Sequence, residues 1–185
     1  GTTSINFDAN WVGERALAFV AEVSSTNSAL WAACEDTGVD LIEANVSEIL
    51  DNDPAMTLVA DGCKFSARLV IAADGVDSTV CRLAGVAVKS RASTDAAVAT
   101  VVRTEGAPGN TAFQRFGSQG PLAFLPLGHS LSCTHCSAVI WSQDIAVTES
   151  VVALDDSAFI NVLQDASEGV LGRIHEVDRR FAFLL

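Results

Sequence analysis

The residues best suited to chemistry lie in one short turn, where Asp74 and Gly75 precede Asp77 and Ser78. Gly75 permits backbone conformations that are closed to other residues. Asp77 or Ser78 can cap a following helix by accepting hydrogen bonds from its first N–H groups. Such a helix start favours an anion, and Asp74 can accept a hydrogen bond from a ribose hydroxyl or hold a water against a phosphate.

The element that must position this turn is the preceding run of residues 69–73, which is continuously apolar. This pattern is typical of a strand buried on both faces of a parallel sheet, because helices cover both sides of such a sheet. Asp74 and Gly75 then end the strand. The crevice beyond the carboxyl ends of parallel strands is where α/β proteins bind nucleotides. The stretch therefore predicts a nucleotide site at the edge of a parallel sheet.

The run ADGVDSTVCRLAGV resembles the Asp-Gly motif of the class A flavoprotein monooxygenases. That motif is an apolar strand, Asp-Gly, one or two residues, Ser, and an Arg four residues after the Ser. Asp74, Gly75, Ser78 and Arg82 occupy these positions. The resemblance implies that these four residues help to bind the pyrophosphate and ribose of FAD and take part in the use of NAD(P)H. An ordinary capped strand-turn-helix is the alternative interpretation.

The second half of the chain resembles one branch of this family, the ubiquinone-biosynthesis hydroxylases, which act on polyprenylated phenols. The matching positions are Gln114-Arg115-Phe116, Gly120-Pro121-Leu122-Ala123, Pro126-Leu127 and Trp141-Ser142. The runs VATVVRTEG and ALDDSAFINVL are also similar to that branch. The likeness then covers nearly the whole chain, and it is stronger than the Asp-Gly turn alone.

The resemblance implies aromatic hydroxylation, in which NAD(P)H reduces FAD and oxygen bound to the flavin passes to an activated phenol. The protein docks the cofactor, excludes water and presents the ring. Phe113, Phe124 and Leu125 are the candidates for an apolar wall against an isoprenoid substrate. No residue is assigned as an acid, a base or a metal ligand, because in these enzymes the flavin carries the difficult chemistry.

The fold class expected is α/β, of the para-hydroxybenzoate-hydroxylase type. Residues 1–90 would form part of a doubly wound FAD-binding layer that carries the Asp-Gly motif, and residues 91–185 an antiparallel substrate-domain sheet with a helix. We expect strands at 16–23, 39–50, 56–60, 63–67, 96–104, 111–116, 122–127, 137–142 and 176–185, and helices at 26–37 and about 155–165. Asp61-Gly62, between two apolar runs, predicts a tight hairpin.

Two features of the family are missing from the sequence. One is the Gly-x-Gly-x-x-Gly turn that binds the ADP part of FAD, and the other is a Gly-Asp motif near the flavin ring. In Glu22-Val23-Ser24, Ser24 stands where family members commonly carry an Arg near the flavin phosphates. We therefore expect an internal fragment of a longer monooxygenase, and a fragment that is inactive and binds FAD poorly by itself.

Charge and hydropathy limit the partners. With 11 Lys and Arg against 23 Asp and Glu, the net charge is −12, which disfavours nucleic acid and anionic membranes. No apolar run approaches the roughly 20 residues needed to span a bilayer, and residues 1–3 do not start a signal peptide. We expect a cytoplasmic protein, with peripheral contact to the inner membrane left open. Homo-oligomers and multi-enzyme assemblies also stay open.

The five cysteines are irregularly spaced, which favours a reducing compartment over a disulfide scaffold. Cys133-Thr134-His135-Cys136, with His129 nearby, has the spacing of a zinc or redox pair. Zinc would need a second pair of ligands, and a thioredoxin-type motif should open a helix. We therefore interpret these as strand-end residues with alternating exposure.

A function of a different class also fits the sequence. The missing glycine-rich turn and the high apolar fraction are compatible with a stand-alone, non-catalytic module that binds an apolar ligand. An upstream Gly-x-Gly-x-x-Gly and a downstream Gly-Asp in the same reading frame would distinguish the enzyme from this module.

Overall fold

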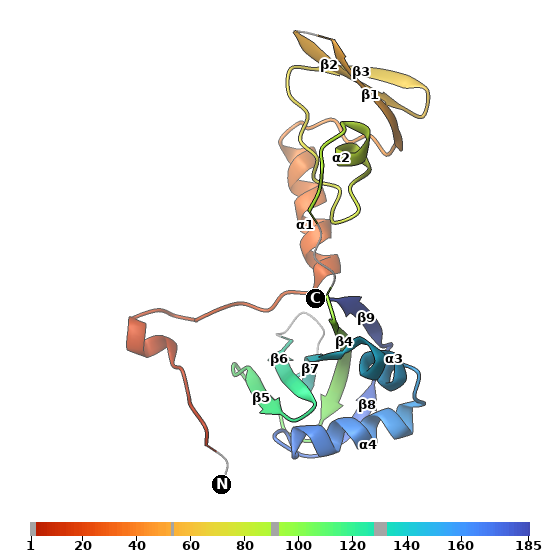
Figure 1. Ribbon diagram of the computed structural model, residues 1–185. Coiled ribbons are helices and arrows are strands. Elements are labelled where there is room, and N and C mark those ends of the chain that lie inside the picture. Colours follow the sequence, from red (N-terminus) through yellow and green to blue (C-terminus); the bar gives the residue numbers. More distant parts are fainter. Residues whose placement is uncertain (1–2, 53, 90–92, 128–132) are drawn as a thin grey trace. The chain divides into compact units, whose positions relative to one another are not determined.

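The computed structural model describes residues 3–52, 54–89, 93–127 and 133–185 of the chain (Figure 1). They form two compact units. One unit contains residues 29–92, and the other contains residues 93–185 together with the N-terminal segment as far as Ser28. That segment includes a short 3-10 helix, η1 (Ala9–Val12), and the first turn of α1 (Val23–Asp36).

The unit of residues 29–92 is built on a three-stranded antiparallel sheet. Its strands, in the order β1-β2-β3, are β1 (Val46–Asn52), β2 (Ala55–Ala60) and β3 (Cys63–Ala67). Ala60 pairs with Cys63, so Asp61 and Gly62 form a two-residue hairpin turn, and both have positive φ (45° and 80°). The predicted hairpin is confirmed, since Asp-Gly is favoured where both turn residues need positive φ. A short helix, α2 (Thr79–Leu83), follows.

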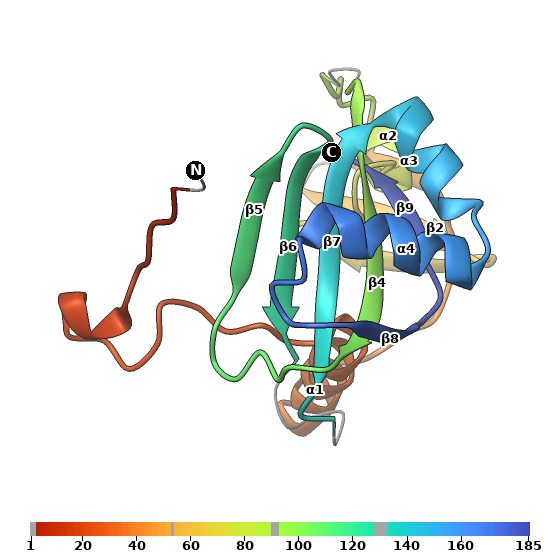
Figure 2. The ribbon, with the colours of Figure 1, turned by 90° about the horizontal axis from the view of Figure 1, so that it is seen from below.

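The second unit is a six-stranded antiparallel sheet with two helices. The strands are β4 (Asp95–Thr104), β5 (Phe113–Gly117), β6 (Gly120–Pro126), β7 (Cys136–Asp144), β8 (Ile174–Val177) and β9 (Phe181–Leu184). Their order is β5-β6-β7-β4-β8, and β9 also pairs with β4. The helices are α3 (Ile145–Val152) and α4 (Asp156–Ser167), and α4 lies across β7 and β4 in Figure 2. The predicted antiparallel sheet is confirmed.

One face of this sheet carries the hydrophobic core. Side chains alternate between the faces of a strand, so every second residue of β4, β6 and β7 points toward the helices. Val98, Trp141 and Leu122 form one cross-strand row of this face, and all are at most 2% exposed. Phe159 and Leu163 of α4 pack on this face and are fully buried. The helix begins where predicted, with the Asp155 carboxylate accepting from the Ala158 N–H at 2.9 Å.

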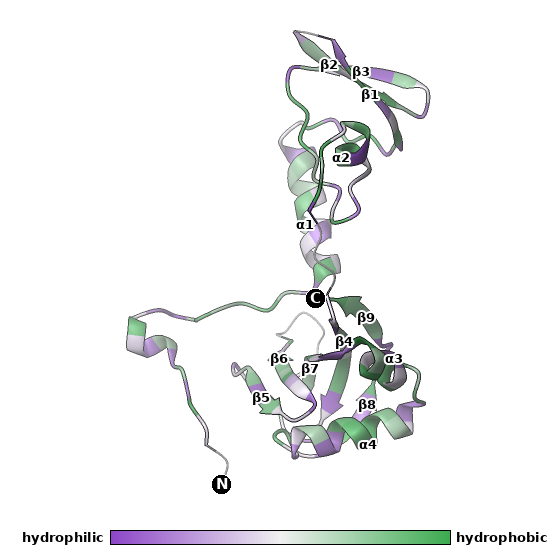
Figure 3. Cartoon of the chain, viewed as in Figure 1, coloured by the Kyte–Doolittle hydropathy of each residue, from purple (hydrophilic) through white to green (hydrophobic). Residues whose placement is uncertain are grey.

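The opposite face of the sheet, which we call the open face, has apolar side chains at its centre that are only half-buried. Leu125, Ala138 and Val101 form one cross-strand row, and Ala123, Ile140 and Ala99 form the next. Phe181 of β9 extends the second row, and β9 is hydrophobic along its length (Figure 3). Helices α3 and α4 both pack on the first face. The open face is therefore apolar surface that these helices do not cover.

Residues 69–73 are not the buried strand that their composition predicts. They have no regular secondary structure, and Leu69 and Ile71 are 73% and 78% exposed. An apolar segment becomes a strand only where a neighbouring strand accepts and donates its backbone hydrogen bonds, and no described strand pairs with these residues. The mixed α/β class is confirmed, but the parallel strand is not formed.

Four smaller expectations also need correction. The predicted strand 39–50 begins only at Val46, as β1. The predicted strand 16–23 is irregular as far as Glu22, and α1 begins at Val23. The predicted last strand is divided into β8 and β9 by residues 178–180. Helix α3 was not expected, because its eight residues directly continue the apolar pattern of β7.

Two matched substitutions test this distribution of burial. Val139→Asp places a carboxylate in the core of the sheet, where the valine is fully buried, and should cost several kcal/mol. Ile71→Asp should change the free energy of unfolding by no more than about 0.5 kcal/mol, because that side chain is exposed. Urea unfolding of both variants measures the difference. Equal losses would show that Ile71 is buried after all.

Candidate functional site

The residues of the Asp-Gly motif form a single hydrogen-bonded turn at the start of α2. The Asp74 carboxylate accepts hydrogen bonds from the Ser78 hydroxyl and, at 3.1 Å, from the Val80 N–H. Ser78 is the N-cap residue of α2, and its Oγ accepts from the Cys81 N–H at 2.9 Å. The helix start near Ser78 is confirmed, and Ser78 rather than Asp77 caps it.

Gly75 and Arg82 complete the motif in different ways. Gly75 has φ +92°, a region that L side chains rarely adopt, and no heavy atom lies within 4 Å of the position of a Cβ. The turn is thus open above this residue. The Arg82 guanidinium extends back along α2 and donates to the Thr79 hydroxyl at 3.1 Å. The structure therefore brings Asp74, Gly75 and Ser78 together, with Arg82 one helical turn further on.

The hydrogen bonds of the turn favour the ionised form of the Asp74 carboxylate. Bonding to the Ser78 hydroxyl, and then to the Val80 N–H, lowers the pKa of Asp74 below its ordinary value of 3.8. The carboxylate is fully exposed and ionised at neutral pH. Two of the first N–H groups of α2 are already occupied by Asp74 and Ser78. The turn consequently offers a carboxylate acceptor, and it does not offer those two N–H groups to a phosphate.

The predicted substrate residues divide between the two faces of the sheet. Phe124 is 2% exposed in the core under α4, and Phe113 is its cross-strand partner, packed against the same core. Phe124 is therefore part of the core and has no surface for a ligand, which corrects the prediction for this residue. Leu125, one position further, is half-buried on the open face and stays a candidate.

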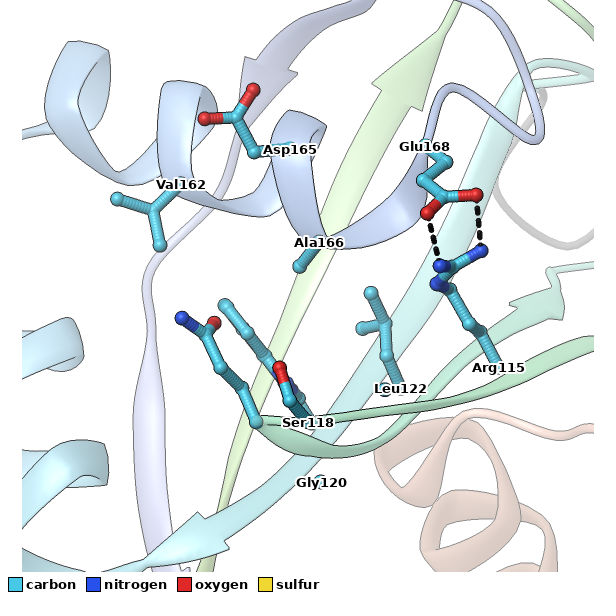
Figure 4. A pocket seen from close by; sticks show the side chains of 11 residues that line it. Arg115, Ser118, Gly120, Leu122, Val162, Asp165, Ala166 and Glu168 are labelled. Carbon is cyan, nitrogen blue, oxygen red and sulfur yellow. Dashed lines mark hydrogen bonds and ion pairs between the residues drawn. The ribbon is translucent and has the colours of Figure 1, made fainter.

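A groove of about 410 Å³ lies between the β5–β6 hairpin and α4 (Figure 4). Arg115 makes a two-point ion pair there with Glu168, at 2.6 Å between Nη1 and Oε2. The side chains of Arg115 and Glu168 are both partly exposed. Such pairs contribute about 1 kcal/mol or less, so this one links α4 to the hairpin without dominating stability.

Cys133 and Cys136 are joined by a disulfide, which the sequence interpretation did not expect. The sequence signal was the two-residue gap itself, which we set aside because a second ligand pair and a following helix were missing. Cys34, Cys63 and Cys81 are free. His129, considered with this pair, lies outside the described residues. The disulfide therefore replaces the interpretation of four independent strand-end residues.

The described part of the chain contains no group of three or more His, Cys, Asp or Glu side chains arranged to hold a metal ion. Within the same residues, no helix is both long and apolar enough to cross a bilayer.

Several curated proteins with similar sequences are named as enzymes of ubiquinone biosynthesis. The mitochondrial ubiquinone biosynthesis monooxygenase COQ6 of Xenopus tropicalis is 34% identical over 58% of this chain and 22% of its own length. The 3-demethoxyubiquinol 3-hydroxylase of Escherichia coli is 32% identical over 68% of this chain and 33% of its own length. The ubiquinone hydroxylase UbiL of Rhodospirillum rubrum is 27% identical over 73% of the chain and 30% of its own length. This chain thus spans about a fifth to a third of these relatives.

Solved structures with a similar fold include flavoproteins. The flavin-dependent halogenase CmlS matches 86% of this chain and 30% of its own, with a TM-score of 0.65 and 18% identity. A flavoprotein/dehydrogenase from Cytophaga hutchinsonii matches 90% of this chain and 42% of its own, with a TM-score of 0.68 and 13% identity. No family model matches the sequence.

The fold is therefore that of the flavin-dependent monooxygenases and halogenases. Within that class, the chain is homologous to the ubiquinone-biosynthesis hydroxylases over the shared region. The resemblance inferred from the motifs is confirmed. The sequence alignments extend over 58 to 73% of the chain, which is less than the nearly complete coverage that the motifs suggested.

The lowered pKa of Asp74 predicts how the stability of this turn depends on pH. The lowered pKa of Asp74 means that the ionised carboxylate stabilises the folded turn, so this stability is complete above the ordinary value of 3.8 and is lost as the pH falls through the lowered pKa. Amide hydrogen exchange at Val80 should accelerate, relative to intrinsic exchange, only below that range. Asp74→Ala should show the faster exchange at every pH. Unchanged protection in Asp74→Ala would contradict the cap.

Proposed function

We propose that this chain takes part in the flavin-dependent hydroxylation of an aromatic ring that carries an apolar chain. The observation that supports this most directly is the sequence similarity to three kinds of ubiquinone hydroxylase, including 32% identity to the Escherichia coli enzyme over 68% of the chain. We propose FAD as the cofactor and NAD(P)H with O2 as co-substrates. The stand-alone binding module is not favoured by these relatives.

The Asp-Gly turn fits one part of FAD better than another. The exposed Asp74 carboxylate keeps lone pairs free for the hydroxyl groups of a ribose, and the open space above Gly75 lets a sugar approach the backbone. A phosphate would meet an ionised carboxylate where the motif places it, and two N–H groups of α2 are already bonded. We therefore assign Asp74 and Gly75 to the sugar rather than to the pyrophosphate.

The open face is the surface that we assign to the substrate. Leu125, Ala138 and Val101 form an apolar row at its centre, next to a second row that includes Ile140. An isoprenoid tail laid across these rows would remove apolar surface from water on both sides, at roughly 25 cal/mol per Å². When bound, the flavin supplies the oxygen chemistry, and the role of this face is to hold the ring still and to exclude water.

The chemistry of the proposed substrate indicates where in the cell the protein works. A polyprenylated phenol dissolves in membranes, so we propose that the protein works in the cytoplasm and meets its substrate at the surface of the inner membrane. The net charge of −12 disfavours direct binding of the protein to anionic lipid headgroups. We therefore propose that the protein is held at the membrane as part of a protein assembly or a homo-oligomer.

Complementation tests the proposed function. The open reading frame that carries this chain should restore ubiquinone synthesis to Escherichia coli lacking its 3-demethoxyubiquinol 3-hydroxylase. Asp74→Ala should lower the rate of ubiquinone formation by about tenfold, because it removes the charged acceptor of a hydrogen bond to the cofactor. Asp77→Ala is the matched control, since it removes an equal charge from the same turn.

A second pair of variants tests the substrate face, with the purified full-length enzyme and varied concentrations of a prenylated phenol. Leu125→Asp should impair hydroxylation by raising the KM for the prenylated substrate, because it places a charge in the apolar row. Val170→Asp should leave KM unchanged, because Val170 is 46% exposed and outside the open face. Equal activity of the Leu125 and Val170 variants would remove the open face from the proposal. Failure of the wild-type frame, expressed and folded, would refute the hydroxylase assignment.

The 185-residue chain itself should bind FAD only weakly. The sequence lacks the glycine-rich turn whose N–H groups hold the ADP part, and a few hydrogen bonds from Asp74 cannot offset the freedom lost on association. Titration of the purified chain, followed by flavin fluorescence, should show no stoichiometric quenching. Tight binding would show that the turn at residues 74–78 is a complete site.

A further inference from the structure

The Cys133–Cys136 disulfide closes an exposed turn at the start of β7. The two Cα atoms are 5.5 Å apart. Cys133 is half-buried and Cys136 is 8% exposed, and the two residues between them are exposed. An incoming molecule can thus reach the sulfur of Cys133 more easily than that of Cys136.

The turn is held to the sheet by hydrogen bonds that do not involve sulfur. The His135 carbonyl accepts from the N–H of Thr104 at 3.0 Å and from its hydroxyl at 3.2 Å. The Nδ1 of His135 lies 3.0 Å from the Glu105 carbonyl oxygen, to which it can donate. Strand β7 also pairs with β4 along its length and with β6. The sheet consequently does not depend on the disulfide to keep its register.

A cationic residue lies opposite Cys136, the less exposed of the two cysteines, on the neighbouring strand. Arg103 of β4 is the direct cross-strand partner of Cys136. The Thr104 N–H bonds to His135, so Arg103 and Cys136 form the adjacent non-hydrogen-bonded pair, in which opposite side chains lie closest. Both residues line one small cavity of about 100 Å³, together with Glu176 and Asp178. The Nε of Arg103 donates to Glu176 at 3.0 Å.

We propose that Cys133 and Cys136 are a redox-active pair that exchanges with thiols. A thiolate attacks the Sγ of Cys133, so a new S–S bond forms to Cys133, the bond within the pair breaks, and its electrons leave on Cys136. A second thiolate then attacks the sulfur that joined Cys133, and Cys133 leaves. Two thiols are thereby oxidised to one disulfide, the pair is reduced to two thiols, and each protein thiolate takes a proton from water.

The roles of the two sulfurs follow from exposure and charge. Cys133 is the accessible electrophile, and Cys136 is the leaving group. A leaving thiolate departs faster when its pKa is lower, and the Arg103 guanidinium stabilises the anion that forms on Cys136. The Glu176 carboxylate forms an ion pair with Arg103, and its negative charge destabilises a thiolate on Cys136. The rate of exchange therefore depends on these two charges with opposite signs.

Differential alkylation with peptide mapping tests the proposal on the full chain. The folded protein is incubated with reduced glutathione or with reduced thioredoxin, and the thiols of Cys133 and Cys136 are counted over time. Cys34, Cys63 and Cys81, which react from the start, are internal controls. We expect both pair thiols to appear while the Val139 amide stays protected from exchange, and oxidised glutathione to restore the disulfide. Reduction by thioredoxin alone would identify a protein thiol as the partner.

Two variants separate electrostatics from loosening of the fold. Arg103→Gln and Glu176→Gln each break the same ion pair. If the loss of that pair only loosened the fold, the rate of disulfide reduction would change in the same direction in both variants. We expect Arg103→Gln to slow the reduction roughly two- to fivefold and Glu176→Gln to accelerate it by a similar factor. Changes of equal sign would overturn the role of Cys136 as leaving group.

Two other results would overturn the proposal as a whole. One is a pair that stays reduced in oxidised glutathione, which would mean that the disulfide does not form. The other is a disulfide that is reduced only after denaturant has removed the protection of Val139, which would make it a purely structural bond.

Discussion

The antiparallel pairing of β7 with β4 and β6 is the constraint on which the larger unit depends. Because side chains alternate along each strand, this pairing assigns every residue of the three strands to one of two faces. Trp141 and its neighbours meet α4 on one face and form the core. Leu125 and Cys136 lie on the other face, which contains the candidate substrate surface and the disulfide. A shift of the register by one residue would exchange the two faces completely.

The structure of the Asp-Gly turn depends on hydrogen bonds between residues that are close in the sequence, and not on strand pairing. The bonds from Ser78 and Val80 to Asp74, and from Cys81 to Ser78, connect residues within six positions of one another. The turn therefore forms although the preceding residues 69–73 are not paired as a strand. The same bonds use part of the hydrogen-bonding capacity that an anion would need. Local stability and ligand binding thus compete for the same groups.

The features that the sequence predicted well are those fixed by nearby residues. Asp61 and Gly62 determine a hairpin by their own backbone preferences, and Asp155 caps α4 through a bond to Ala158. The errors concern long-range partners. The apolar run at Ile71 does not say whether a strand lies beside it, and composition does not distinguish Phe124 from Leu125, whose environments differ because alternation places them on opposite faces.

Residues 69–73 and the open face have exposed apolar surface in common. Leu69 and Ile71 are exposed to water, and the two central apolar rows of the open face are only half-buried. Contiguous apolar surface exposed to water is unfavourable, and such surfaces commonly bind a ligand or another protein. The relatives are three to five times as long as the regions that match this chain. The exposed apolar side chains of residues 69–73 and of the open face are therefore available for contacts beyond those that the described residues make with one another.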